Sequence, residues 1–95
     1  MATKCSDMHE AIVLAINASD LKPLAKVRIK MLMRSKVICA LVCQRVENRL
    51  IEEAVIAETA CWDPESWDWD KVIARLKELI SFIVEIVLII VNLFI

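Results

Sequence analysis

The residues of this chain that could bind a metal ion form two pairs, Cys5 with His9 and Cys39 with Cys43. Each pair is separated by four positions, so on a helix its two side chains would share one face. Four such ligands could complete a zinc site, but neither pair has the two-residue gap of the common zinc motifs. Cys39 and Cys43 also lie in an apolar stripe, where cysteine packs as a small hydrophobe. We therefore expect no bound metal and no other cofactor.

Catalytic chemistry has few candidate residues in this sequence. His9 is the single histidine, and no serine or cysteine is spaced with it in a pattern that indicates an activated nucleophile. The chain contains no glycine. Phosphate-binding loops and dinucleotide fingerprints need glycine where the backbone approaches the ligand, so both are excluded. We expect that the protein is not an enzyme.

A polar stripe on an apolar C-terminal segment is the strongest pattern in the sequence. Of the seventeen residues from 79 to 95, fourteen are apolar. Glu78, Glu85 and Asn92 recur every seven residues, and Ser81 lies between them, so the four form one narrow line along a helix. Polar groups in lipid face a bundle interior or a water-filled cavity. The stripe therefore predicts self-association through hydrogen bonds between subunits, or the lining of a pore.

Three tryptophans, Trp62, Trp67 and Trp69, come just before this apolar segment. Tryptophan prefers the membrane–water interface, because its ring is buried there while its N–H stays hydrated. Together with the apolar run, they predict a membrane helix over residues 72–95. Basic residues lie on its N-terminal side, which predicts a single-pass protein with a cytoplasmic N-terminus by the positive-inside rule.

Charge is segregated in the middle of the chain. Residues 22–36 contain no acidic residue and six basic ones, Lys22, Lys26, Arg28, Lys30, Arg34 and Lys36. An acid-rich stretch follows over residues 47–70. The basic segment is predicted to contact anionic lipid headgroups or an acidic partner. Pairing of basic and acidic segments between two subunits and a solvated helix surface are the alternatives. The net charge is −1 and no aromatic residue interrupts the basic segment, so nucleic acid is not an expected partner.

An all-α fold is predicted, because helical periodicity runs through most of the chain and the absence of glycine disfavours tight turns. Asp7 and Glu10 have the spacing of a capping box, which predicts the start of a short N-terminal helix. This helix is predicted to end near Asn17. A long amphipathic helix is predicted over residues 21–60. A helix of that length suits an extended assembly, or else it breaks near residues 34–35.

The apolar stripe of the long helix includes Ile38, Val42, Val46 and Leu50. Pro64 disfavours helix at the preceding residue, so the last helix is predicted from about residue 67 to the end. It would pack in an antiparallel hairpin or an oligomeric bundle. These boundaries predict three regions, which are a helical amphipathic region (1–61), a turn and interfacial segment rich in tryptophan and acid (62–71) and a membrane helix (72–95).

The sequence as a whole predicts a small, tail-anchored α-helical membrane protein that forms homo-oligomers. Its expected role is structural or membrane-perturbing, as in the viroporins and holins of viruses and phages, which can form ion channels or pores. Two alternatives stay open. In one, the chain is a soluble helical assembly or interaction module whose apolar C-terminal helix is buried in its core. In the other, residues 21–60 dock a protein partner while the tail holds the protein in a membrane.

Overall fold

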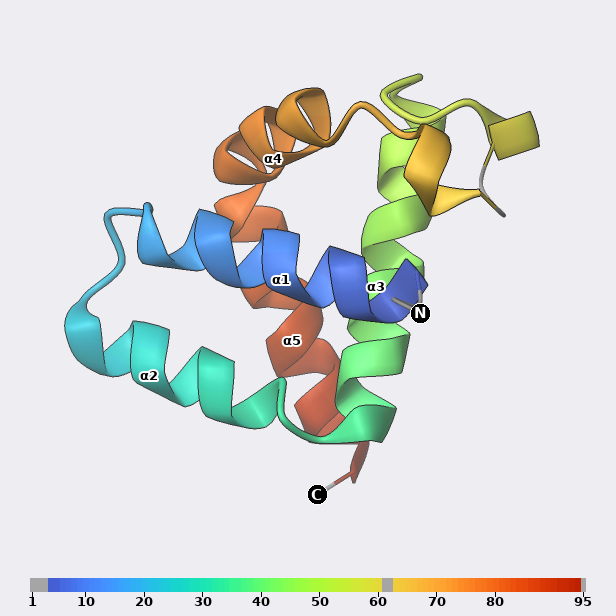
Figure 1. The fold of residues 1–95 in the computed structure, drawn as a ribbon. Helices are drawn as coiled ribbons and strands as arrows, with labels where there is room; N and C mark the ends of the chain where they lie inside the picture. Colours follow the sequence, from blue (N-terminus) through green and yellow to red (C-terminus); the bar gives the residue numbers. More distant parts are fainter. Residues whose placement is uncertain (1–3, 61–62, 95) are drawn as a thin grey trace.

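A computed structural model of the chain describes residues 4–60 and 63–94. Over these residues the chain forms five α-helices and no strand (Figure 1), so the predicted all-α fold is confirmed. Two short 3-10 helices, η1 and η2, lie between the third and fourth α-helices. The elements in chain order are α1 (Lys4–Asn17), α2 (Pro23–Leu32), α3 (Lys36–Glu52), η1 (Glu58–Ala60), η2 (Pro64–Ser66), α4 (Trp69–Glu78) and α5 (Ile80–Phe94).

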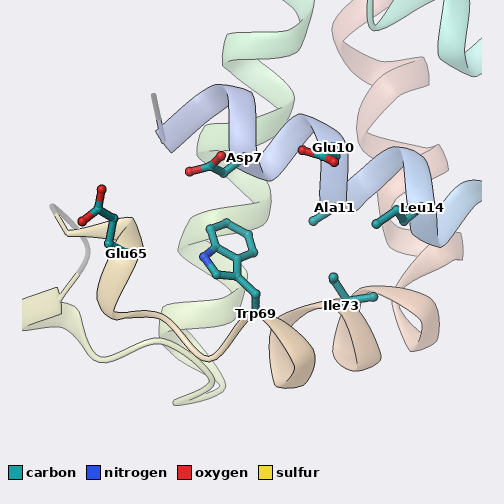
Figure 2. A pocket seen from close by; sticks show the side chains of 7 residues that line it. All are labelled: Asp7, Glu10, Ala11, Leu14, Glu65, Trp69 and Ile73. Carbon is teal, nitrogen blue, oxygen red and sulfur yellow. The ribbon is translucent and has the colours of Figure 1, made fainter. Parts of the chain in front are cut away.

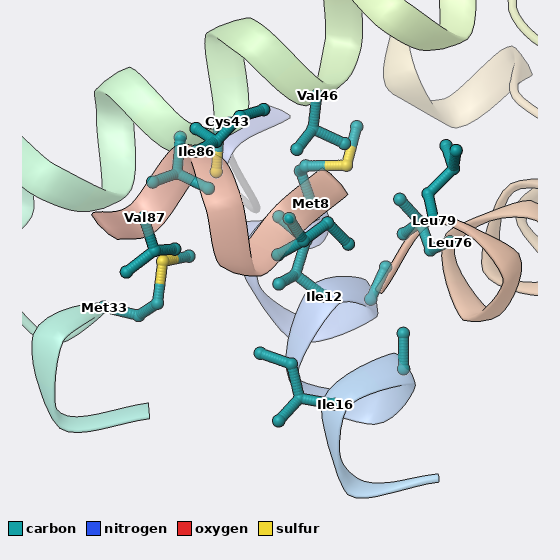
Figure 3. Close-up of a cluster of buried hydrophobic side chains, with 14 of the residues drawn as sticks. Met8, Ile12, Ile16, Met33, Cys43, Val46, Leu76, Leu79, Ile86 and Val87 are labelled. Atoms are coloured by element: carbon teal, nitrogen blue, oxygen red, sulfur yellow. The ribbon is translucent and has the colours of Figure 1, made fainter. Parts of the chain in front are cut away.

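The helix at the centre of the fold is α1, which packs against α2, α3 and α4 (Figure 1). Its inner residues recur at the three- and four-residue spacing of a buried helical face. They are Met8, Ala11, Ile12, Ala15 and Ile16, and all five are buried. Figure 3 shows Met8 and Ile12 in one cluster with Val46 of α3, Ile86 of α5 and Leu79. The core is therefore assembled around α1.

The segment predicted as one long helix is two helices followed by an irregular stretch. α2 ends at Leu32 and α3 begins at Lys36, so the predicted break near residues 34–35 is confirmed. Ser35 caps α3, because its hydroxyl accepts a hydrogen bond from the backbone N–H of Ile38 at 3.5 Å. The predicted apolar stripe forms the inner face of α3, except that Ile38 is only partly buried. Its buried residues are Cys39, Val42, Cys43, Val46 and Leu50.

α3 ends at Glu52, earlier than the predicted end near residue 60, and the cause is the backbone of Ala54. Ala54 is left-handed, with φ 58°. Its N–H donates to the carbonyl of Ile51 at 3.0 Å, and the N–H of Val55 donates to the carbonyl of Leu50 at 2.9 Å. This pair of bonds forms a Schellman motif, in which the left-handed position is usually glycine. A residue with a Cβ atom at that position costs about 1–2 kcal/mol.

The predicted last helix is also two helices, α4 and α5, which bend at Leu79. The N–H of Leu79 donates to the carbonyls of both Arg75 and Leu76, at 3.1 and 3.0 Å, so the final turn of α4 tightens there. A straight helix over residues 69–94 would be about 39 Å long, whereas the longest axis of the molecule is 35 Å. The bend lets α4 pack on α1 and α5 pack on α3.

Both halves of the bent segment bury one apolar side. The buried residues are Val72, Leu76, Leu79, Ile83, Ile86, Val87 and Ile90. In residues 4–60 and 63–94, no helix combines the length and the apolar character needed to cross a membrane.

Replacing Ala54 by glycine is expected to stabilise the fold. Relief of the left-handed alanine gains about 1–2 kcal/mol, and the greater freedom of glycine in the unfolded chain removes about 0.5–1 kcal/mol of that gain. We expect the free energy of unfolding, measured by urea denaturation, to rise by about 0.5–1 kcal/mol. The matched control is Ala57→Gly, in the exposed irregular stretch that follows, which should bring no gain. An equal gain at both positions would contradict the assignment of strain to Ala54.

Candidate functional site

A groove of about 400 Å³ lies between α1 and α4, with η2 at one end (Figure 2). Its apolar walls are formed by Ala11 and Leu14 of α1 and by Trp69 and Ile73 of α4. Leu14 is 48% exposed although it neighbours the core face of its helix. A volume of this size is typical of the smaller ligand pockets of proteins. The groove can therefore take a few apolar side chains of a ligand.

Three carboxylates stand around these apolar walls, from Asp7 and Glu10 of α1 and from Glu65 of η2. Glu10 and Glu65 are exposed, and Asp7 is half-buried. None of the described residues that line the groove is basic, so the groove favours a cationic ligand. We name this set the acidic groove. Its members are Asp7, Glu10, Ala11, Leu14, Glu65, Trp69 and Ile73.

The indole ring of Trp69 is held in place by contacts from the turn before α4. Its Nε1 donates to the carbonyl oxygen of Pro64 at 2.9 Å. The ring also packs against Trp67, with centroids 5.1 Å apart and planes tilted by 42°. Asp68 caps α4, because its carboxylate accepts from the N–H of Lys71 at 3.3 Å. Trp69 is thus a fixed wall of the groove, as Figure 2 shows.

The three tryptophans predicted to lie at a membrane interface have different surroundings. Trp67 is buried in the core, at 7% exposure. Trp69 is half-buried and lines the acidic groove. Trp62 lies outside the described residues. Their role at a membrane interface stays a prediction.

The polar stripe predicted on the C-terminal segment is exposed over its whole length. Its members are Glu78, Ser81, Glu85 and Asn92. Glu78 is the last residue of α4 and pairs with Arg75. Glu85 lines a second groove, between α3 and α5, whose lining also includes Arg45 and Arg49. Self-association or pore formation through this stripe stays a prediction.

The structure divides the six basic residues into two groups. Lys26 Nζ donates to the carbonyl oxygen of Asn17 at 3.0 Å, and Lys30 Nζ donates to the Oδ1 atom of Asn17 at 2.9 Å. Both ammonium groups therefore sit at the C-terminus of α1, where the helix dipole is negative, and they fasten α2 to α1. The other four are exposed. Arg28 lies on α2, Lys22 and Arg34 lie in the segments that flank it, and Lys36 is the first residue of α3.

The candidate metal ligands do not form a cluster of three in the part of the chain that the structure describes. The sulfurs of Cys39 and Cys43 are 3.8 Å apart on the buried face of α3. His9 is half-buried on α1. The side chain of Cys5 and the residue Cys61 lie outside what the structure describes.

Sequence reasoning did not identify the acidic groove. The capping-box spacing of Asp7 and Glu10 predicts a helix start there, whereas α1 begins at Lys4, and the tryptophan cluster predicts a membrane interface for Trp69. The sequence does contain one indication of the groove. Asp7, Glu10 and Leu14 have the i, i+3 and i+7 spacing of one helical face, and this face differs from the buried face of α1. That spacing puts an apolar side chain beside two acids on a surface that the core does not use. Pairing this side with Trp69, more than fifty residues away, required the tertiary fold.

Comparison of the chain with protein-family models, with curated proteins and with solved structures gives no match.

A charged network joins the end of α3 to α4, and none of its members lines the acidic groove. Arg49 Nε donates to the carboxylate of Glu53 at 2.8 Å, and Arg75 donates to both Glu53 and Glu78. The hydrogen bond from Arg75 is the main cause that lowers the pKa of Glu53 from 4.5 to about 2; partial burial opposes it, and the bond from Arg49 adds to it. The bonds to Glu53 and Glu78 raise the pKa of Arg75. This network is structural, because it fixes α4 against α3.

Glu53→Gln is expected to destabilise the protein at neutral pH and to lose that effect in acid. The folded-state pKa of Glu53 is about 2 and its ordinary value is 4.5. Its ionised form therefore stabilises the fold above the ordinary value, and this contribution is lost as the pH falls toward 2. The measurement compares urea midpoints of parent and variant at several pH values in this window. Glu52→Gln, at an exposed neighbour, is the control. A parent–variant difference that does not shrink in acid would contradict the role of Glu53.

Proposed function

We propose that this chain is a small helical interaction module whose acidic groove binds an amphipathic, basic helix of a protein. The observation that carries the proposal is an apolar groove between two helices with three carboxylates at its rim. A matching ligand places aliphatic side chains between Leu14, Trp69 and Ile73 and presents lysine or arginine to the acids. Amphipathic helices bind in grooves by this arrangement, through side chains at positions i, i+3, i+4 and i+7.

The groups of the groove contribute different parts of the binding free energy. Full burial of one aliphatic side chain gives about 1.5–3 kcal/mol. The face of Trp69 can also stack with a guanidinium group. Glu10 and Glu65 are exposed, so each contributes little affinity but selects a positively charged ligand and speeds its encounter. We therefore expect modest affinity that decreases as the salt concentration rises.

The proposal corresponds to the alternative in which the apolar C-terminal helix belongs to the core of an interaction module. Its support comes from the inner face of α5, where Ile83 and Val87 are fully buried. Transfer of α5 into lipid would remove these side chains from the core. Each large-to-small core deletion costs about 2–5 kcal/mol, so removal of a whole helix face would unfold a domain of this size.

A synthetic helical peptide tests the proposal. The probe is built of alanine, with leucine at positions i, i+3 and i+7 and with lysine at i+4 and at both ends. We expect it to shift the NMR signals of the Trp69 indole N–H and of the Ala11 amide in a saturable way. The control peptide has glutamate in place of every lysine and should bind at least about tenfold more weakly.

The groove variant Glu10→Arg should weaken binding of the lysine peptide. Glu52→Arg, which replaces an exposed acid outside the acidic groove, should leave that binding unchanged. Equal binding of both peptides, or shifts confined to residues outside the acidic groove, would refute the proposed site.

A second candidate function is the tail-anchored, self-associating membrane protein with a structural or membrane-perturbing role. It is favoured by one observation, the outer side of α5, where Leu88, Ile89 and Leu93 are each at least half exposed. These side chains could meet lipid if α5 left the globule or lay on a membrane surface. Oligomerisation through the polar stripe and contact of the exposed basic residues with headgroups belong to this candidate.

Flotation of the full chain with anionic vesicles separates the two functions. For an interaction module we expect the chain to stay at the bottom of the gradient. For a membrane protein it would float and resist an alkaline carbonate wash, and Leu93→Lys should reduce flotation while Ala74→Lys, at an exposed position on α4, should not. Flotation that is reversed by salt alone would indicate contact of the basic residues with headgroups and would contradict insertion of α5.

A further inference from the structure

The outer side of α2 is apolar and basic together. Leu24, Val27 and Met31 are 63%, 48% and 60% exposed, so three large hydrophobic side chains of one helix face solvent. Arg28 is exposed on the same side, because the four residues follow the i, i+3, i+4 and i+7 spacing of one helical face. We name Leu24, Val27, Arg28 and Met31 the α2 face. It has the pattern by which a helix enters an apolar groove.

The α2 face and the acidic groove are complementary in charge and in length. Arg28 lies within the α2 face, and Lys22 and Arg34 lie beyond its two ends. On the groove side, Asp7, Glu10 and Glu65 stand around the apolar walls. The α2 face covers seven residue steps, as does the wall of α1 from Asp7 to Leu14, so each is about 10 Å long. One molecule therefore carries both a groove and a helix that suits it.

A molecule cannot fill its own groove with its own α2. In Figure 1, α4 lies on one side of α1 and α2 on the other, and α1 contacts both. The bonds from Lys26 and Lys30 to Asn17 hold α2 in that place. The α2 face points outward from this attachment, since its apolar side chains are exposed. Its counterpart must come from another molecule.

We infer that the acidic groove of one copy of this chain binds the α2 face of a second copy. The inference rests on the proposed function and identifies its partner. Because two different surfaces meet, the contact is heterologous, and repeated contacts produce a closed ring or an open chain of molecules. Arg28 meets the carboxylates of the groove, while Leu24, Val27 and Met31 lie against Leu14, Trp69 and Ile73. The contact is small, so the association is weak and depends on salt.

Two variants that each disable one half of the contact provide the test. Glu10→Arg puts a positive charge into the groove and leaves the α2 face intact. Leu24→Asn with Met31→Asn removes apolar contacts from the α2 face and leaves the groove intact. All three positions are exposed, so both variants should keep the thermal midpoint of the parent within a few degrees. Circular dichroism checks this before any binding is measured.

Sedimentation velocity then follows the mass of each protein from about 10 μM to about 1 mM, the range expected for a small contact. The average mass of the parent should increase with concentration, and this increase should be smaller at high salt. Each variant alone should associate at least about tenfold more weakly. An equimolar mixture should restore one contact, between the α2 face of the groove variant and the groove of the α2 variant, and stop at a dimer. Lys36→Asn, outside both surfaces, should behave as the parent does.

A parent that stays monomeric over this range would overturn the inference, and so would association that neither variant weakens. The lysine peptide separates these failures from failure of the proposed function. If the peptide binds in the acidic groove while the parent stays monomeric, the groove serves a different protein helix, and only self-association is refuted. If the parent is monomeric and the peptide does not bind, both proposals are refuted.

Discussion

The fold depends on burial of one face of α1. Met8, Ile12 and Ile16 have no exposed surface, and α2, α3 and α4 all pack against this helix. A chain of 95 residues can bury only a modest core. Its helices share that core, because α1 and α5 each pack against α2, α3 and α4. Hydrophobic contact is non-directional, so it does not by itself set the orientation of the outer helices. The hydrogen bonds from Lys26 and Lys30 to Asn17 orient α2, and the arginine network orients α4 against α3.

The acidic groove is the other side of the same helix. An α-helix repeats every 3.6 residues, so residues 7, 10 and 14 lie away from the stripe that includes Ile12 and Ile16. α4 covers part of α1 and leaves Leu14 and the two acids beside Trp69 and Ile73. Core and candidate site are therefore built on two sides of one rigid element. This explains how so small a protein can present a groove with fixed walls: the position of each wall is set by the burial of its inner side.

Local pattern predicted much of the secondary structure, and tertiary packing decided the rest. The stripe on α3 and the break at Ser35 follow from periodicity and from a capping residue. The turn at Ala54 gave no sequence signal, because alanine is an unfavourable residue for a left-handed backbone and the chain has no glycine to mark the place. The bend at Leu79 was equally hidden, since the apolar stripe continues through it without proline or glycine. The groove joins α1 to α4, and no local pattern reports which distant helices meet.

The apolar tail shows why hydrophobicity alone could not assign a function. α5 has a buried side with Ile83 and Val87 and an exposed side with Leu88 and Leu93. The mean hydropathy of the segment does not distinguish these two sides. A globule of this size covers only one side of α5, and Ser81, Glu85 and Asn92 are exposed beside its outer apolar residues. The α2 face is also apolar, but it carries a positive charge and has a counterpart of opposite charge and equal length on the same molecule. Complementarity therefore gives a more specific reason to propose a partner for α2 than apolar character alone gives for α5.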